Sequence, residues 1–178
     1  RFKRVRLGPR AAAVRGDIRA LPFRKRMRFP LVMAPYGILQ SLLRDVDVRA
    51  TLASVAAVVP RRGLFVVDLV PDLLRWQEYE RRVGLCGRGP GGGWLTLIET
   101  VRQDYDRKMT IFDQEFVERV GRRRETYRCS IAFRTLTIGQ MSGRLERAGF
   151  TVETVLGDYG GREWSPDAEV WVIVARKG

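Results

Sequence analysis

The sequence predicts an α/β protein with a mostly parallel sheet, and two observations carry that prediction. Within residues 1–83, short apolar strands alternate with helical segments, an order typical of a parallel sheet covered by helices. Between residues 94 and 136, apolar and polar side chains instead alternate with a period of about two, which indicates half-exposed antiparallel strands. We therefore expect a core made of residues 1–83 and 137–178, with an antiparallel β-meander inserted at 94–136.

Three strands and three helices are expected in the first part of the chain. The helix at 48–59 places Leu52 and Val55 at helical spacing, and Gly63 lies in the turn that follows it. The next strand is apolar except for Asp68, which we interpret as a cap for the following element rather than as a ligand-facing group. The expected strands are 11–14, 31–34 and 64–70, and the expected helices are 37–43, 48–59 and 72–83.

The glycine-rich segment 84–93 is interpreted as a flexible linker. It lacks the Lys-Ser or Lys-Thr pair of a phosphate-binding loop, and it precedes a strand rather than a helix. The alternation in the insertion slips at Leu97–Ile98 and at Ile111–Phe112, so the pattern leaves the strand register open. The expected strands of the insertion are 94–101, 109–117 and 126–136, and after it come a helix at 138–148 and an antiparallel pair of strands at 150–156 and 170–175.

The positive charge of the chain is concentrated at one end. The net charge is +13, from 33 basic and 20 acidic residues. Residues 1–28 hold eleven basic side chains and one acidic one, which leaves 22 basic and 19 acidic side chains in the other 150 residues. We interpret this as a solvated basic end, and a nucleic-acid groove is the less favoured alternative.

The composition excludes several classes of site and compartment. The chain has no histidine, which removes the usual general base and the common zinc sites. Its two cysteines, Cys86 and Cys129, fit neither a metal spacing nor a disulfide framework, so no metal is expected. Without a long apolar run or a signal-peptide pattern, no membrane association is expected and a cytoplasmic location is predicted.

Four short motifs follow one another along the chain, at residues 16–23, 29–36, 59–68 and 145–150. The first is Gly-Asp-Ile-Arg-Ala-Leu-Pro-Phe, and the last is Leu-Glu-Arg-Ala-Gly-Phe before the final strands. Their order resembles that of the class I S-adenosylmethionine-dependent methyltransferases. Small-molecule methyltransferases with an antiparallel insertion before the last helix and strand pair are the most similar group.

The resemblance implies a Rossmann-like sheet with the strand order 3-2-1-4-5-7-6, incomplete on its amino-terminal side. The first strand of that family, with its glycine-rich loop, and the second strand have no counterpart in this sequence. Either another segment or chain fills the gap, or residues 11–15 pair directly with residues 31–34. The insertion would then act as a lid or as a homodimer surface.

The resemblance also implies a set of site residues at the carboxyl ends of the strands. Asp17 would accept a hydrogen bond from the adenine amino group of the cofactor, and the backbone of Ile18 would donate to the ring. Tyr36 could face the sulfonium by a cation–π contact or the substrate through its hydroxyl. The expected cofactor-binding residues are Asp17, Ile18, Ala34, Pro35, Tyr36 and Leu39, and the expected substrate-binding residues are Tyr36, Gln40, Tyr159 and Trp164.

The function expected from these motifs is in-line transfer of a methyl group from S-adenosylmethionine to a small molecule. No catalytic residue is identified. Glu99, Asp113, Glu115 and Tyr127 are candidate bases, but outward-facing strand residues are the favoured interpretation. Two alternatives remain open: a non-catalytic, partner-binding relative or truncated fragment, and an RNA or DNA methyltransferase that uses the basic amino end.

Overall fold

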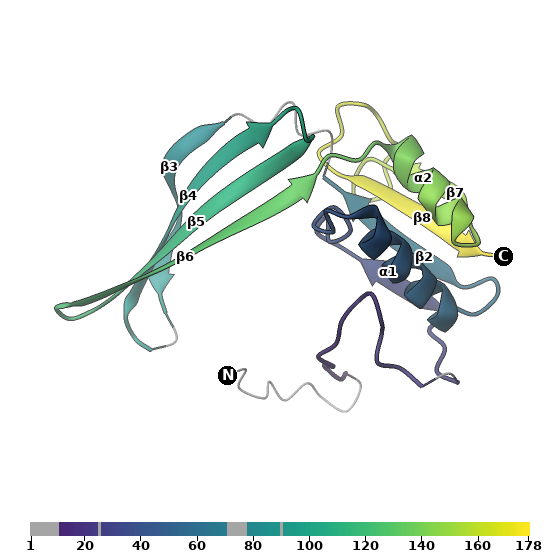
Figure 1. Ribbon diagram of the computed structural model, residues 1–178, viewed down its shortest axis with the longest axis horizontal. Helices are drawn as coiled ribbons and strands as arrows, with labels where there is room; N and C mark the ends of the chain where they lie inside the picture. The colour runs from purple at the N-terminus through teal and green to yellow at the C-terminus, as the bar shows by residue number, and fades with distance from the viewer. Residues whose placement is uncertain (1–10, 25, 71–77, 90) are drawn as a thin grey trace.

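The computed structural model describes residues 11–24, 26–70, 78–89 and 91–178. Within these residues the chain forms two four-stranded sheets and two helices (Figure 1). The strands are β1 Leu31–Ala34, β2 Leu64–Leu69, β3 Tyr79–Arg88, β4 Trp94–Asp104, β5 Met109–Val120, β6 Arg123–Arg134, β7 Phe150–Leu156 and β8 Trp171–Lys177, and the helices are α1 Asp45–Val58 and α2 Ile138–Arg147. The α/β prediction is confirmed.

The core sheet has the order β1-β2-β8-β7. Strands β1 and β2 are parallel, with Leu31 opposite Leu64, and β8 lies antiparallel between β2 and β7. This order corresponds to the last four strands of the order expected from the resemblance. The carboxyl ends of β1 and β2 consequently lie at the same edge of the sheet.

Both helices pack on one face of the core sheet (Figure 1). Phe65 and Ile173 point to this face and are fully buried with Leu52 of α1 and Leu145 of α2. Helix α2 begins with a capping box between Thr137 and Gln140, which satisfies backbone donors at its first turn. Burying these apolar side chains fixes the strand ends to which the candidate site is attached.

The outer edge of β1 has no partner strand among the described residues. Residues 11–15 form no strand and do not pair with β1, so the expected strand at 11–14 is wrong. Leu31 and Met33 of this edge strand are 50 % and 60 % exposed, whereas Val32 and Ala34 on its other face pack against the core. An unpaired edge next to apolar side chains is a surface on which another strand can add.

The insertion is a four-stranded antiparallel sheet, not a three-stranded one. Residues 79–88 form β3 and pair with β4, although a helix at 72–83 and a linker at 84–93 were expected. The pairing of β3 with β4 contains two register shifts, one between Tyr79 and Arg82, where Arg81 has a positive φ, and one between Val83 and Leu85, at Gly84. The part of the expected helix at 71–77 lies outside the described residues.

The expected helix at 37–43 is also wrong, because the chain forms consecutive turns there. Tyr36 and Gly37 both have φ of 61°, a left-handed conformation from which a right-handed helix cannot continue.

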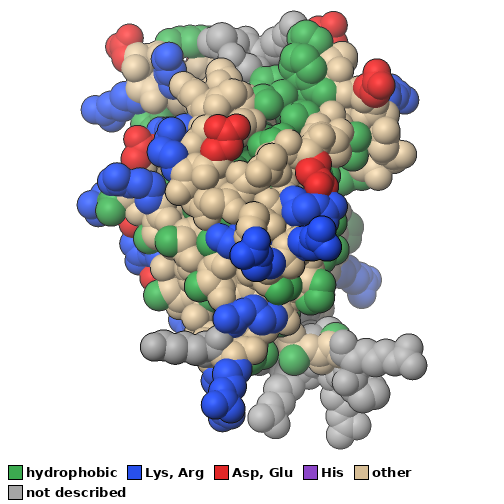
Figure 2. All heavy atoms as spheres, turned by 90° about the vertical axis from the view of Figure 1, so that its right-hand side faces the viewer, with side chains coloured by type: hydrophobic (Ala, Val, Ile, Leu, Met, Phe, Trp, Pro, Cys, Tyr) green, Lys and Arg blue, Asp and Glu red, His purple; other side chains and the backbone are tan. Residues whose placement is uncertain are grey.

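No described helix has the length and apolar character needed to cross a bilayer. The end of the core farthest from the insertion mixes basic, acidic and apolar side chains (Figure 2).

Candidate functional site

The carboxyl ends of β1 and β2 meet at Asp68, a carboxylate that is 4 % exposed. Its Oδ1 accepts a hydrogen bond from the backbone N–H of Gly37 at 2.7 Å. Its Oδ2 accepts from the backbone N–H of Tyr36 at 2.9 Å and from the hydroxyl of Tyr159 at 2.5 Å. A buried carboxylate requires such donors, so Asp68 joins the turn after β1, the end of β2 and the loop between β7 and β8. Among the described residues, it caps the preceding turn, and the expected following element at 71–77 lies outside them.

The turn after β1 is built to present Tyr36. Both N–H groups aimed at Asp68 come from residues with positive φ, an arrangement that concentrates backbone donors on one anion. Glycine is required at position 37, because a Cβ there would lie 2.8 Å from Oε1 of Gln40 in addition to the unfavourable φ. The ring of Tyr36 is 85 % exposed and is available to a ligand.

Tyr159 faces the same point from the opposite side of the sheet edge. Its loop is ordered by Asp158, whose carboxylate accepts from the backbone N–H groups of Gly160 and Arg162 at 2.8 and 2.9 Å. The hydrogen bond to Asp68, together with burial and the nearby charges of Asp68 and Tyr36, raises the pKa of Tyr159 to about 12. At neutral pH the hydroxyl therefore donates to Asp68 and offers only its oxygen lone pairs to a ligand.

Gln40 joins the insertion to this site and is completely buried. Its Oε1 accepts from the backbone N–H of Val70 at 2.8 Å, and its Nε2 donates to the carbonyls of Val70 at 3.1 Å and Arg134 at 3.3 Å. Its own backbone carbonyl accepts from the N–H of Arg134 at 2.9 Å. The amide is fully engaged within the protein, so Gln40 connects the turn after β1 with the end of β6.

A second contact holds the end of β6 against the start of α1. Asp45 Oδ1 accepts from Arg134 at 2.8 Å and from Arg144 of α2 at 3.0 Å. These guanidiniums, first Arg144 and then Arg134, lower the pKa of Asp45. The insertion therefore leaves the core at the edge where the candidate site lies (Figure 1).

Asp17 and Ile18 lie in a tight turn that packs on α1 rather than in contact with Asp68. The carboxylate of Asp17 accepts from the backbone and guanidinium of Arg19, at 2.8 to 3.2 Å. Arg19 also reaches Asp47 at the start of α1, and its guanidinium lowers the pKa of Asp17 to about 2. The carboxylate is thus ionised and partly occupied, while about half of its side chain stays accessible.

The remaining predicted site residues divide between core and surface. Leu39 is 1 % exposed and belongs to the core, so it supports the turn rather than facing solvent. Trp164 is 41 % exposed and packs edge-on against Trp171, with 6.3 Å between ring centroids. Ala34 ends β1, and Pro35 follows it directly before Tyr36.

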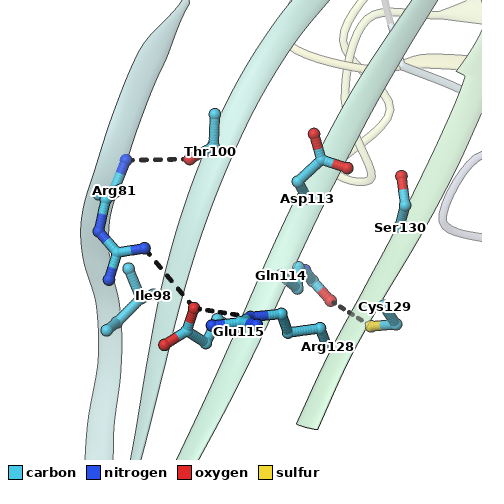
Figure 3. Close-up of a pocket in the computed structure, with 9 residues that line it drawn as sticks. All are labelled: Arg81, Ile98, Thr100, Asp113, Gln114, Glu115, Arg128, Cys129 and Ser130. Atoms are coloured by element: carbon cyan, nitrogen blue, oxygen red, sulfur yellow. Dashed lines mark hydrogen bonds and ion pairs between the residues drawn. The ribbon is translucent and has the colours of Figure 1, made fainter. Parts of the chain in front are cut away.

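The insertion carries a shallow hollow of about 410 Å³ on one of its faces (Figure 3). At its centre, Glu115 Oε2 lies 3.1 Å from Arg128 and 3.5 Å from Arg81. Arg128 lowers the pKa of Glu115, and Arg102 followed by Ser130 lowers that of Asp113. These two carboxylates are thus ionised and already paired, which makes them weak proton acceptors. Glu99, another candidate base, is engaged by Tyr79 and Gln114.

The sequence interpretation did not include Asp68 in the site, although one signal pointed to it. It is the single charge in a strand that is otherwise apolar, and a buried strand retains a charge only where donors surround it. The three donors come from segments 31 and 91 residues away in sequence, so no local pattern could identify them.

Comparison with known proteins relates the fold to one class of enzymes. No family model and no curated protein matches the chain. Among solved structures, an S-adenosylmethionine-dependent methyltransferase from Clostridium acetobutylicum ATCC 824 aligns with a TM-score of 0.71 and 12 % identity, over 92 % of this chain and 63 % of that one. The CcbJ methyltransferase from Streptomyces caelestis has a TM-score of 0.71 and 16 % identity, over 92 % and 66 %. The sugar N-methyltransferase KedS8 from Streptoalloteichus sp ATCC 53650 has a TM-score of 0.69 and 13 % identity, over 92 % and 61 %.

These likenesses show that the chain has a methyltransferase-like fold. Most of this chain aligns in each case, but it spans only 61 % to 66 % of the length of those structures.

Proposed function

We propose that this chain is part of an S-adenosylmethionine-dependent methyltransferase that acts on a small molecule, and that it contributes the carboxyl ends of β1 and β2 to the site. The observation that carries the proposal is the Asp68 cluster at the carboxyl ends of parallel strands, in a methyltransferase-like fold. Ligands of open α/β sheets bind at that edge. The two exposed tyrosines and the buried carboxylate suit a ligand that carries a cation, which can make a cation–π contact, and a hydrogen-bond donor.

The residues of this chain suit the two ends of the proposed cofactor. About half of the Asp17 side chain is accessible, so an adenine amino group could reach its carboxylate by replacing one of the hydrogen bonds from Arg19, and Tyr36 presents an exposed side chain where the positive sulfonium would lie. Asp68 adds a negative charge at the backbone of Tyr36. Bound S-adenosylmethionine supplies the methyl group, and the chain's own contribution is to orient the acceptor in line with it.

Tyr159 is proposed to orient the methyl acceptor. Because its hydroxyl hydrogen is committed to Asp68, its oxygen accepts a hydrogen bond from an N–H or O–H of the acceptor. Trp164, exposed in the same loop, would form part of the wall for the acceptor.

The free edge of β1 is the proposed place where the sheet is completed. A strand that adds there would lie directly beside Ala34–Gly37, where the glycine-rich loop expected from the resemblance would meet the cofactor. We propose that another segment or a second chain supplies that strand.

The insertion is proposed to form a homodimer through one face. Leu85, Leu97, Phe116 and Tyr127 lie opposite one another across its four strands and so share a face. Two of them, Leu85 and Tyr127, are 72 % and 56 % exposed. The accessible surface of the chain is 13038 Å², against roughly 9,000 Å² for a compact monomer of this mass.

Sedimentation analysis of two matched variants tests the dimer. Leu85→Asp should dissociate it, whereas Thr126→Asp, which changes an exposed residue on the opposite face, should not. A monomeric wild-type protein at all concentrations would contradict the dimer.

A second function, as a non-catalytic partner-binding protein, is favoured by one observation: Arg19 already occupies the Asp17 carboxylate. Calorimetric titration with S-adenosylmethionine and S-adenosylhomocysteine separates the two. Saturable binding on the order of micromolar, weakened at least tenfold by Asp17→Ala and unchanged by the exposed control Asp106→Ala, supports the enzyme. Folded protein that binds neither compound supports the second function.

A further inference from the structure

The tip of the insertion separates its charges onto opposite faces. At the β5–β6 end, Arg119 lies opposite Arg124, and Trp94 lies opposite Arg119 on the other side, with Arg88 beyond it. One row across four strands is therefore Arg88, Trp94, Arg119 and Arg124, all on one face. In the sequence the acidic neighbours Glu118 and Glu125 balance this charge, but the alternation of a strand places them on the other face.

Within the part of the chain that the structure describes, the arginines of this row have no partner. The guanidiniums of Arg88, Arg119 and Arg124 make no ion pair or hydrogen bond with the described part of the chain. By contrast, Glu125 on the opposite face is paired with Arg123 and Tyr127. Two like charges directly opposite each other in a sheet are destabilising. A bound anion would therefore reduce the repulsion between Arg119 and Arg124.

Beside the arginines is a hollow with an apolar floor. It has a volume of about 230 Å³ and is bounded by Trp94, Arg119 and Arg124, with the buried Val117 below. Trp94 is 50 % exposed and lines this hollow, so part of its side chain is accessible to a ligand there. An aromatic platform beside guanidiniums suits a ligand that carries both flat rings and phosphates.

The hollow continues along the same face. Ile98 lines both this hollow and the larger one of Figure 3, in which Arg128 and Arg81 follow. The face is thus a track rather than a single pocket. Its uncompensated positive charge lies at the row of Arg88, Arg119 and Arg124, because farther along Glu115 pairs with both Arg128 and Arg81. A track of this kind fits an extended chain of nucleotides better than a compact ligand.

We infer that this face of the insertion, from the Arg88–Trp94–Arg119–Arg124 row toward Arg128, binds single-stranded nucleic acid. The arginines neutralise phosphates and Trp94 stacks on a base. Such binding is independent of the proposed methyl transfer and uses a surface other than the basic amino end of the chain.

Fluorescence anisotropy with a labelled oligodeoxythymidine, measured over a series of salt concentrations, tests the inference. Each lost phosphate contact to a single strand lowers the salt slope by about 0.7, so the triple variant Arg88→Gln, Arg119→Gln, Arg124→Gln should lower it by about 2. The matched control, Arg15→Gln, Arg24→Gln, Arg26→Gln, removes the same charge from exposed positions near the amino end. It should leave the slope unchanged.

The stacking contribution is tested separately. Trp94→Ala should weaken binding roughly tenfold without changing the salt slope, and Trp94→Phe should restore most of the affinity. The inference would be overturned if the two triple variants lost the same amount of salt slope, or if the wild type did not bind the oligonucleotide at low salt. It would also be overturned if the protein bound dextran sulfate as well as the oligonucleotide and Trp94→Ala had no effect. Circular dichroism of every variant distinguishes these results from loss of folding.

Discussion

Replacing Asp68 by alanine should destabilise the protein by about 3 kcal/mol. The change leaves the N–H of Gly37 buried without an acceptor, and a lost hydrogen bond to a charged group costs about 1.5–3 kcal/mol. The N–H of Tyr36 is partly exposed and the Tyr159 ring is 69 % exposed, so both recover part of their loss by bonding to water. Asp68→Asn keeps one acceptor oxygen and should cost about half as much.

Thermal unfolding followed by circular dichroism measures this loss. For a chain of 178 residues, 3 kcal/mol corresponds to a lowering of Tm by roughly 6–12 °C. The exposed Asp106→Ala serves as the control and should leave Tm within about 1 °C. If Asp68→Ala unfolds at the same temperature as this control, the three hydrogen bonds do not hold the strand ends together.

The same substitution has a spectroscopic consequence. Without the carboxylate, the pKa of Tyr159 should fall from about 12 toward its ordinary value of 10.0, seen as an ultraviolet difference titration against Tyr159→Phe. Because the folded pKa is the higher one, this hydrogen bond contributes stability below pH 10.0 that is lost as the pH rises through about 12. A tyrosine titration that is identical in wild type and Asp68→Asn would refute this pairing.

Three further substitutions test the surroundings of the site. Gly37→Ala should cost about 2 kcal/mol in a urea melt because it adds a Cβ at positive φ, 2.8 Å from Gln40, and a neutral outcome would mean that the turn rearranges freely. Phe65→Ala should cost about 3–5 kcal/mol, measured the same way, since this fully buried ring packs 5.6 Å from that of Phe150. Arg19→Ala should return the pKa of Asp17 from about 2 toward 3.8, followed by carboxyl NMR. In the wild type this pair contributes stability above pH 3.8 that is lost as the pH falls through about 2, and an unchanged pKa would contradict the pairing.

The elements with a clear hydrophobic period were predictable from the sequence. The strand expected at 31–34, the helix expected at 48–59 and the strand expected at 150–156 lie within a few residues of the observed bounds. Each has an apolar pattern that only one kind of element can bury, and each is ended by a proline, a glycine or a cap.

The missed elements are those decided by contacts distant in sequence. Residues 79–88 contain glycines and charges that locally favour a loop, and they become a strand because β4 offers them a pairing edge. Residues 37–43 have helical spacing, but the two donors that Asp68 draws together hold Tyr36 and Gly37 in a left-handed conformation. The strand register decides which face of the insertion each charged side chain occupies. The breaks in the apolar–polar alternation at Leu97–Ile98 and Ile111–Phe112 left that register open.

The attachment of the insertion at Gln40 has a mechanical consequence. The twelve residues of β6 make an arm on the order of 40 Å long, held at one end by the buried side chain of Gln40, which also lies in the turn of the site. A rotation of about 5° at this pivot would carry the far end of the arm through roughly 3 Å. A ligand that changes the conformation of the turn at Tyr36 would therefore displace the far end of the insertion by a larger distance than it moves the turn itself.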